Sequence, residues 1–186
     1  MNKVMLCAAL ALLCTLAVHG EIQVQNDFNL DQFLGKWYII GMASDAQWFT
    51  TRKEKFKMST ILMKTPENDK VETVLTKLRR GKCLQIIFPY RRTGREGQFV
   101  FHSDRWNNDH EVYVTETNYG EYALIHNTII KGSDVTTLVK LYGRAQELRP
   151  ELLERFRQYS LAQGLEDENI VTFTKLDECK PTSAQN

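Results

Sequence analysis

The chain has 186 residues, and its 24 Lys and Arg side chains nearly balance 23 Asp and Glu side chains, which leaves a formal net charge of +1 at pH 7. This balance gives no indication of nucleic acid or of an anionic membrane as a partner, because both attract chains with a strong positive field. The length suits a single domain that is large enough to enclose a core or a cavity.

The first residues have the order of a secretory signal peptide. Lys3 supplies an early positive charge, an apolar run follows from Val4 to Val18, and small residues lie near Gly20. The apolar run is too short to span a bilayer comfortably, so a membrane anchor is the less favoured alternative. We therefore expect residues 1–20 to be a cleaved signal peptide. Residues 21–186 would form one secreted, extracellular domain without stable insertion into a membrane.

Two cysteines would remain after that cleavage. Cys7 and Cys14 lie in the expected signal peptide, whereas Cys83 and Cys179 lie in the expected mature chain. In an oxidising compartment this pair predicts one disulfide bond, with two separate buried thiols as the alternative. The bond would close a long loop, which is worth about 4 to 5 kcal/mol in the chain-entropy treatment. It would leave no free thiol for redox or nucleophilic chemistry.

From Gly35 onward, short runs of β-branched and aromatic residues alternate with turns rich in Gly, Asn and Asp. This is the pattern of an all-β barrel or sandwich. The predicted strands are 36–43, 56–64, 71–78, 84–89, 97–103, 110–116, 121–127 and 135–142. Eight strands in meander order can close on themselves and leave no edge, so we predict an eight-stranded antiparallel up-and-down β-barrel. A sandwich with a filled core is the alternative that the period does not exclude.

Several predicted strands carry apolar residues at alternate positions, as Leu84, Ile86 and Phe88 do. Alternate residues of a strand face the same side of a sheet, so one such set would point into the barrel. The interior of an eight-stranded barrel is wide enough to hold one small ligand. The pattern therefore favours a lumen with apolar walls.

One later segment has the period of a helix. It would begin at Pro150 and end near Gly164, which gives an amphipathic helix of about four turns. Its apolar stripe comprises Leu152, Leu153, Phe156 and Tyr159. Such a stripe needs a partner, and we expect the helix to pack on the outside of the barrel. A last short strand is expected at 170–173.

Three short motifs resemble those of the lipocalin family. Gly35-Lys36-Trp37 opens the first strand after a short amphipathic turn at 29–34, Thr117-Asn118-Tyr119 lies between the sixth and seventh strands, and Arg144 follows the eighth. In lipocalins the corresponding residues meet at the closed end of the barrel, where the arginine packs across the indole. Asn118 replaces the usual aspartate of the family but keeps its ability to bond the turn backbone.

Two groups within the family are similar to this chain, the alpha-1-microglobulin group and the lipocalin-type prostaglandin D synthase group. The first resemblance rests on Thr117–Ala123, Lys140–Ala145 and Gln163–Ile170. The second rests on Phe33–Trp37, Met42–Ser44, Trp48 and Arg149–Leu152. The sequence does not separate the two.

Both groups imply a reactive cysteine that this chain lacks. The catalytic cysteine of the synthase group, which isomerises prostaglandin H2, corresponds to Ser59. A serine hydroxyl is a far weaker nucleophile than a thiolate unless a base is paired with it. The reactive cysteine of the alpha-1-microglobulin group corresponds to Ala46. We therefore predict no catalytic residue.

Strand parity and the family alignment together indicate a set of ligand contacts. The candidates are Ile39, Trp48, Ser59, Ile61, Leu75, Phe88, Phe99, Phe101, Lys140 and Tyr142. For each strand position, plain core filling is an equal alternative. Trp48 lies on a long loop after the first strand, where we expect it to cover the pocket or the barrel wall. Lys140 would meet a ligand carboxylate if it points inward, and it would be solvated if it points outward.

The remaining polar clusters give weaker indications. His102 and His110 flank a hairpin, but two histidines without a carboxylate or thiol partner rarely bind a metal, so we expect no metal and no cofactor. Basic residues cluster on two hairpin turns and would form a solvated rim, with contact to an anionic partner or a cell-surface receptor left open. They are Lys77, Arg79, Arg80, Lys82, Arg91, Arg92 and Arg95. We expect a monomer.

The leading functional hypothesis is a secreted carrier of a small hydrophobic molecule, such as a retinoid, a fatty acid or a similar lipid. Apolar surface buried on binding would supply the affinity. The alternative is prostaglandin D synthase activity, which is disfavoured because Ser59 stands where the catalytic cysteine would be. A third hypothesis is an interaction protein that uses the barrel as a scaffold and the basic rim as its contact surface.

Overall fold

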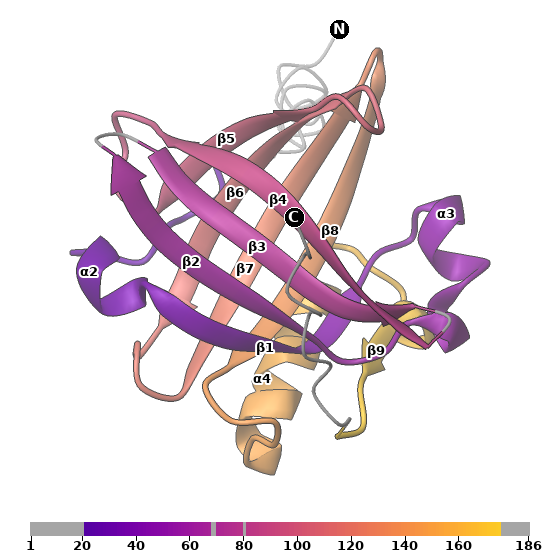
Figure 1. The fold of residues 1–186 in the computed structure, drawn as a ribbon. Coiled ribbons are helices and arrows are strands. Elements are labelled where there is room, and N and C mark those ends of the chain that lie inside the picture. The colour runs from indigo at the N-terminus through magenta and orange to yellow at the C-terminus, as the bar shows by residue number, and fades with distance from the viewer. Residues whose placement is uncertain (1–20, 68–69, 80, 176–186) are drawn as a thin grey trace, which may run out of the picture.

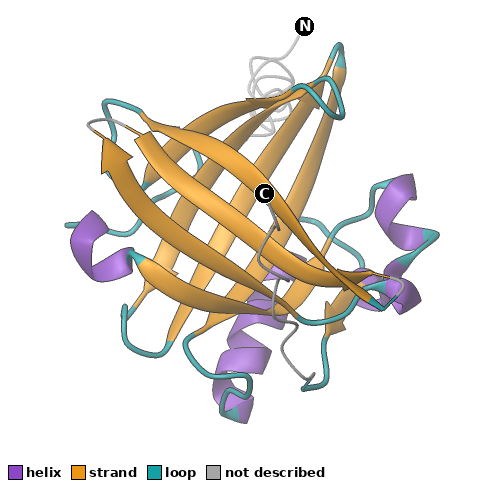
Figure 2. Cartoon of the chain, in the orientation of Figure 1, coloured by secondary structure: helices purple, strands orange, loops and turns teal. Residues whose placement is uncertain are grey.

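The computed structural model describes residues 21–67, 70–79 and 81–175. The strands form one antiparallel sheet in which each strand from β1 to β7 pairs with the next along the chain (Figures 1 and 2). Their bounds are β1 (Gly35–Ala43), β2 (Ser59–Glu67), β3 (Lys70–Arg79), β4 (Lys82–Arg92), β5 (Gln98–Ser103), β6 (Asn108–Thr117), β7 (Tyr122–Lys131) and β8 (Asp134–Gly143). This is the predicted meander of eight strands.

Strand β1 closes the sheet into a barrel because it pairs with both β2 and β8. Ile39 lies opposite Ser59 of β2 and opposite Tyr142 of β8. The register to β8 shifts between Ile39 and Gly41, and beyond this bulge β1 also pairs with the short strand β9 (Ile170–Thr172). The bulge gives β1 the extra bend that closure and a third partner require.

The helix α4 (Pro150–Ala162) covers the outer face of the barrel, as predicted. Leu152 and Phe156 pack there against outward-facing residues of β1, β7 and β8, including Leu124 and Leu141. A Cβ atom at Gly41 would lie 2.8 Å from the Phe156 ring. The glycine therefore lets the helix approach the strand closely.

The connections between antiparallel strands alternate between the two ends of the barrel. One end carries α2 (Leu30–Phe33) and the turns β2–β3, β4–β5 and β6–β7. The other end carries α3 (Gln47–Thr50), the short 3-10 helix η1 (Lys53–Lys55) and the hairpins β3–β4, β5–β6 and β7–β8. In Figure 1, α2 and α3 mark these ends at the left and the right. A second 3-10 helix, η2 (Asp167–Asn169), precedes β9.

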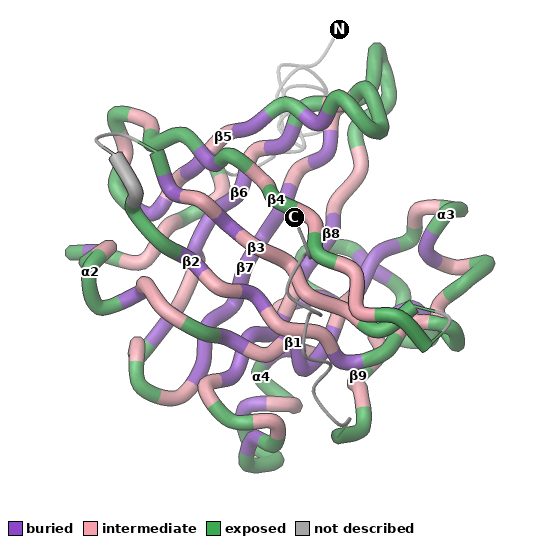
Figure 3. Tube along the Cα trace, viewed as in Figure 1, coloured by how far each residue is buried: buried purple, intermediate pink, exposed green. Residues whose placement is uncertain are grey.

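The predicted elements were correct in kind, and their ends differ by a few residues. Strand β2 begins at Ser59 rather than at 56, because Phe56 stacks on Phe49 of α3 instead of joining the sheet. Strand β4 runs over Lys82–Arg92 and β7 reaches Lys131, since cross-strand pairing continues through charged residues that look like turn residues in the sequence. Buried and less buried residues alternate along strands such as β5, which separates an inner from an outer face (Figure 3).

Candidate ligand-binding site

The inner face of the barrel brings together most of the predicted ligand contacts. One apolar cluster inside the barrel joins residues from β1 to β8 with Phe28 and Phe33 near the N-terminus. It includes the predicted positions Ile39, Ile61, Leu75, Phe88, Phe99, Phe101 and Tyr142. The second apolar cluster lies on the outer face of the barrel, under α4. Alternate residues of the strands therefore face the interior and the outside, as expected from the sequence.

Aromatic rings form a continuous wall along β4 and β5. Phe88 stacks on Trp106 of the β5–β6 hairpin, with ring centroids 6.3 Å apart, and lies 5.3 Å from Phe101. Phe101 in turn stacks on Tyr90 at 5.0 Å, and Tyr90 lies 5.9 Å from Phe99. We call Trp106, Phe88, Phe101, Tyr90 and Phe99 the aromatic wall. It leads from the hairpin at one end of the barrel to the buried interior.

Lys140 of β8 supplies a cation to this interior. It lies opposite Ile125 of β7 and shares its face with Tyr142, which is only 1% exposed and belongs to the inner cluster. Burial lowers the pKa of Lys140 to about 8. Among the described residues its amino group has no hydrogen bond and no ion pair. Lys140 therefore points inward, and a partly desolvated ammonium group stands without a counter-ion in the lumen.

Other polar groups also face the lumen. The His110 ring stacks on Phe101 at 4.2 Å, and its Nε2 lies 2.9 Å from Asn108 Oδ1. Burial, with a smaller contribution from the Lys140 charge, lowers the pKa of His110 to about 4, so this ring is neutral at pH 7. Thr73 of β3 is fully buried, and its hydroxyl finds no partner in the described part of the chain. A buried hydroxyl without a partner is costly unless a ligand or a water molecule satisfies it.

The position of Trp48 differs from the expectation that this ring covers the pocket or the barrel wall. Trp48 lies on α3 and is 41% exposed, whereas its neighbour Phe49 is completely buried. Phe49 stacks on Phe56 at 5.3 Å, and the Trp48 indole meets both rings edge-on. The aromatic residue that anchors this loop to the protein is therefore Phe49, which the sequence reasoning missed because Trp48 is the larger ring.

Ser59 begins β2 and stands on the inner face, half-buried, directly opposite Ile39. Its neighbours on this face include Ile61 and Leu75, which pair with each other across β2 and β3. Within the described residues no histidine or carboxylate accepts a hydrogen bond from Ser59. Nothing in this setting activates the hydroxyl as a nucleophile.

The three motifs meet at the end of the barrel that carries α2. The Arg144 guanidinium lies 3.6 Å from the centroid of a Trp37 ring, as predicted. It also donates hydrogen bonds to the backbone carbonyls of Lys36 and Tyr119, both at 2.8 Å. Asn118 Oδ1 accepts from the backbone N–H groups at 121 and 122, so the asparagine bonds its turn as an aspartate would. This end is closed, and the ligand entrance is expected at the opposite end.

The two histidines that flank the β5–β6 hairpin do not come together. His102 faces outward and contacts Asp109 at 2.8 Å, whereas His110 faces inward, so the two rings lie on opposite sides of the sheet. Within the ranges that the structure describes, no group of three metal-ligating side chains occurs.

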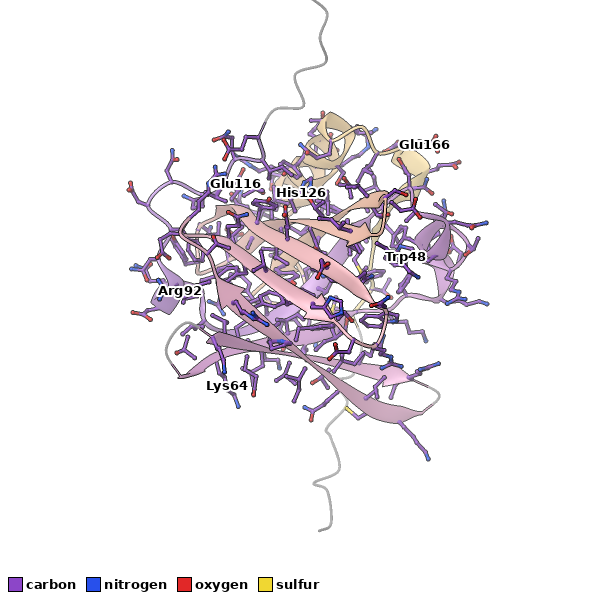
Figure 4. The ribbon with its side chains drawn as sticks, turned by 90° about the horizontal axis from the view of Figure 1, so that it is seen from above. Trp48, Lys64, Arg92, Glu116, His126 and Glu166 are labelled. Carbon is purple, nitrogen blue, oxygen red and sulfur yellow. The ribbon has the colours of Figure 1, made fainter. Side chains whose placement is uncertain are left out.

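The basic residues of the two hairpin turns lie at opposite ends of β4, whose 11 residues span about 35 Å. Lys77, Arg79 and Lys82 stand at the open end. Arg92 and Arg95 stand at the closed end, where they pair with Glu96 and Glu21. Figure 4 accordingly shows Arg92 and Trp48 on opposite sides of the barrel. The two turns look like one group in the sequence because only β4 separates them. That extended strand places them at opposite ends of the barrel.

Some predictions fall outside the described residues. These are the signal peptide at 1–20, Arg80, and Cys179, so the Cys83–Cys179 bond stays a prediction. Cys83 itself lies on β4 and is half-buried. Over the described ranges, no helix is long and apolar enough to cross a bilayer.

Residues 34–177 match the lipocalin / cytosolic fatty-acid binding protein family. A protein named "Lipocalin" from Rhinella marina is 38% identical over 179 residues, which cover 96% of this chain and 98% of that protein. "Protein AMBP" from Bos taurus is 37% identical over 163 residues, and the match covers 87% of this chain but only 46% of that protein, so the chain spans about half of its length.

Two further similarities concern an enzyme and a solved structure. "Prostaglandin-H2 D-isomerase" from Mus musculus is 35% identical over 161 residues, covering 86% of this chain and 85% of that protein. The solved structure of the siderocalin Ex-FABP, described as functioning through dual ligand specificities, superposes with a TM-score of 0.66 at 25% identity. It covers 83% of this chain and 97% of the other.

Proposed function

The chain belongs to the lipocalin / cytosolic fatty-acid binding protein family, and from this premise we propose that it is a secreted carrier of one small lipophilic molecule with an anionic end. Members of this family bind small hydrophobic ligands. The proposal includes cleavage of residues 1–20 as a signal peptide and a Cys83–Cys179 disulfide bond in the mature chain. The observation that carries the choice of ligand is the Lys140 amino group, which has no ion pair among the described residues and lies on a largely apolar inner face.

Lys140 is proposed to bind the anionic end of the ligand, and the aromatic wall is proposed to bind its apolar part. With a pKa of about 8, the Lys140 amino group is roughly nine-tenths protonated at pH 7. A carboxylate that reaches it would offset the cost of holding this charge away from water, and the pair would be little screened in the lumen. The apolar part of the ligand would pack on the aromatic wall at about 25 cal/mol per Å² buried, before the costs of association. Retinoic acid and long-chain fatty acids have this combination.

Most of the remaining proposed contacts lie on the same inner face of the barrel. Ile39, Ile61, Leu75, Phe88, Phe99, Phe101 and Tyr142 supply apolar surface, and Ser59 supplies a hydroxyl among them. Trp48 is proposed as a contact at the entrance rather than within the lumen, since it is partly exposed on α3.

Prostaglandin H2 isomerisation is the second candidate, because a relative bears the name of that activity. The position expected to hold its thiol is Ser59, and no base contacts this serine in the described part of the chain. Ligand carriage needs no such group. The carrier is therefore the better-supported function.

The proposal is tested by titrating purified protein with retinoic acid and with retinol while tryptophan fluorescence is recorded. Trp106 stacks on Phe88 of the aromatic wall, so a bound polyene should quench it. Lys140→Met should weaken retinoic acid by tenfold or more and change retinol less than twofold. Lys131→Met, which removes an exposed lysine from the β7–β8 end, is the matched control.

The pH dependence gives an independent readout. Affinity for retinoic acid should fall as pH rises through about 8, because the amino group then loses its proton, while affinity for retinol stays constant. Native mass spectrometry of protein from its source fluid should also reveal a bound lipid acid. An affinity of Lys140→Met for retinoic acid within twofold of that of the unaltered protein would disprove the ionic contact, and absence of any quenching or co-purifying lipid would disprove the carrier function.

A further inference from the structure

Large exposed apolar side chains gather at the open end of the barrel. Trp48, Leu78, Trp106 and Val135 are 40–67% exposed and all lie on or beside α3 and the hairpins of this end. Among the described residues one other large apolar side chain is comparably exposed, Ile87 on the outer face of β4. Isolated exposed apolar residues are ordinary, but a set around one opening indicates contact with something apolar.

The same end carries exposed cations that make no ion pair within the described residues. They lie between α3 and β2, at the end of β3, at the start of β4 and on the β5–β6 hairpin. We call Arg52, Lys55, Lys57, Arg79, Lys82 and Arg105 the basic arc. Within the described part of the chain, none of their side chains forms an ion pair or a hydrogen bond.

Acidic side chains lie at this end as well, and His102 contacts two of them, Asp104 and Asp109. The others are Asp45, Glu54, Asp134, Glu166 and Glu168. Around the end of β3, the start of β4 and the β5–β6 hairpin, however, Lys77, Arg79, Lys82 and Arg105 outnumber Asp104 and Asp109, so positive charge is in local excess there. At the closed end, by contrast, Arg92, Arg95 and Arg149 are all paired with carboxylates.

The parts of the basic arc lie at the same end of the barrel. The charges of Arg79 and Arg105 add to burial in lowering the pKa of Lys77, so the end of β3 and the β5–β6 hairpin approach each other. In Figure 1, α3 and the end of the β3–β4 pair both lie at the right, at the same end of the barrel. The arc is thus confined to the end that holds the expected entrance to the lumen.

Trp106 connects this surface to the interior. Its indole is 43% exposed, the Arg105 guanidinium lies 5.4 Å from its ring centroid, and its inner face stacks on Phe88 of the aromatic wall. Trp and Arg together suit the interface of a bilayer, where the ring lies at the level of the headgroups and the charge meets phosphate.

We propose that the basic arc, with Trp48 and Trp106, docks the open end of the barrel on an anionic phospholipid surface. Exposed tryptophans would enter the interfacial region while the cations neutralise the lipid charge, which gives reversible binding without insertion of a membrane span. Docking would place the entrance against the bilayer, so that an apolar ligand passes between membrane and lumen without crossing water. This purpose rests on the proposed carrier function, whereas the docking itself does not.

Vesicle co-sedimentation of the mature chain tests the proposal. We expect binding to vesicles of phosphatidylcholine with 30% phosphatidylserine, loss of that binding at 0.5 M salt, and none to phosphatidylcholine alone. A basic residue near an anionic surface is worth roughly fivefold in affinity, so Arg79→Gln with Arg105→Gln should weaken binding about 25-fold. Trp106→Ala should remove the blue shift in tryptophan fluorescence that accompanies docking.

The matched control is Lys64→Gln with Arg91→Gln, which removes the same charge from exposed positions of β2 and β4 nearer the closed end. This control should bind the vesicles within twofold of the unaltered protein. Equal weakening of the two double variants would show that only net charge matters and would overturn the proposal. Capture by a soluble acidic protein without vesicle binding would also overturn it.

Failure of the docking proposal is distinguishable from failure of the carrier function. The arc variants should retain their affinity for retinoic acid in the absence of vesicles, and Lys140→Met should retain vesicle binding. Vesicle binding by a protein that takes up no lipid acid would leave the docking surface intact and reject the carrier function alone.

Discussion

Replacement of Arg144 by alanine should destabilise the barrel without emptying its lumen. The guanidinium lies 3.6 Å from the Trp37 ring centroid, and Trp37 is completely buried. It also donates to the carbonyls of Gln32 in α2 and of Leu34 directly after it, both at 3.0 Å, and thereby fixes that helix over the closed end. Arg144→Ala removes all of these contacts together.

The magnitude follows from the same contacts. A desolvated cation–π contact is worth about 1 to 2 kcal/mol. Charged hydrogen bonds contribute about 1.5 to 3 kcal/mol each, but water can replace part of them at a site as close to the surface as this one. We therefore expect a loss of about 3 kcal/mol in the free energy of unfolding, and a fall in Tm of roughly 6 to 12 °C for a domain of this size.

Urea denaturation followed by circular dichroism measures this loss, and Arg149→Ala is the matched control. Arg149 lies near the same end and pairs with Glu121 at 2.9 Å, but the pair is exposed to solvent, so its loss should lower the stability far less. Affinity for retinoic acid should change less than twofold in both variants, since the entrance lies at the other end. A loss for Arg144→Ala no larger than that for Arg149→Ala would refute the argument.

Three more outcomes are expected. Burial lowers the pKa of both His110 and His126 to about 4, so the unfolded chain binds more protons between pH 6.5 and 4; stability should fall through this window by about 2 kcal/mol per histidine down to pH 5, and a flat urea midpoint from pH 7.5 to 5 would contradict this. Oxidised protein should contain a Cys83–Cys179 bond, detectable by peptide mapping, and its reduction should cost about 4 kcal/mol; labelling of two free thiols in secreted protein would refute the bond. The unaltered protein should convert prostaglandin H2 no faster than buffer with a free thiol, whereas Ser59→Cys should gain measurable activity, because it introduces a group that forms a thiolate near neutral pH.

The sequence predicts the barrel well because its two strongest signals are local. Period-two alternation assigns Phe99 and Phe101 to one face of β5, and parity alone then places them in the lumen. The helix pattern after Pro150 is equally local, and a stripe with Leu152 and Phe156 has to find an apolar partner. Turn residues mark the breaks between strands but not their ends, which cross-strand pairing decides.

Properties that depend on neighbours distant in the chain were less accessible. The choice between Trp48 and Phe49 depends on Phe56, which stacks on Phe49 and thereby withdraws from the predicted second strand. The direction of Lys140 was open in the sequence because the residues on either side of it, Val139 and Leu141, are apolar as well. In the barrel these two pack under α4, so they are buried on the outer face and Lys140 takes the inner one.

The cations at the two ends of the barrel have different surroundings. At the closed end Arg144 is held by a buried ring and by backbone carbonyls, and Arg149 by a carboxylate, so the cations there stabilise the fold. At the open end Arg79 and Arg105 have no ion pair or hydrogen bond in the described chain and stand close enough to depress the pKa of Lys77. Like charges brought together without counter-ions oppose folding, so their place around an opening is better explained by something that binds there than by stability.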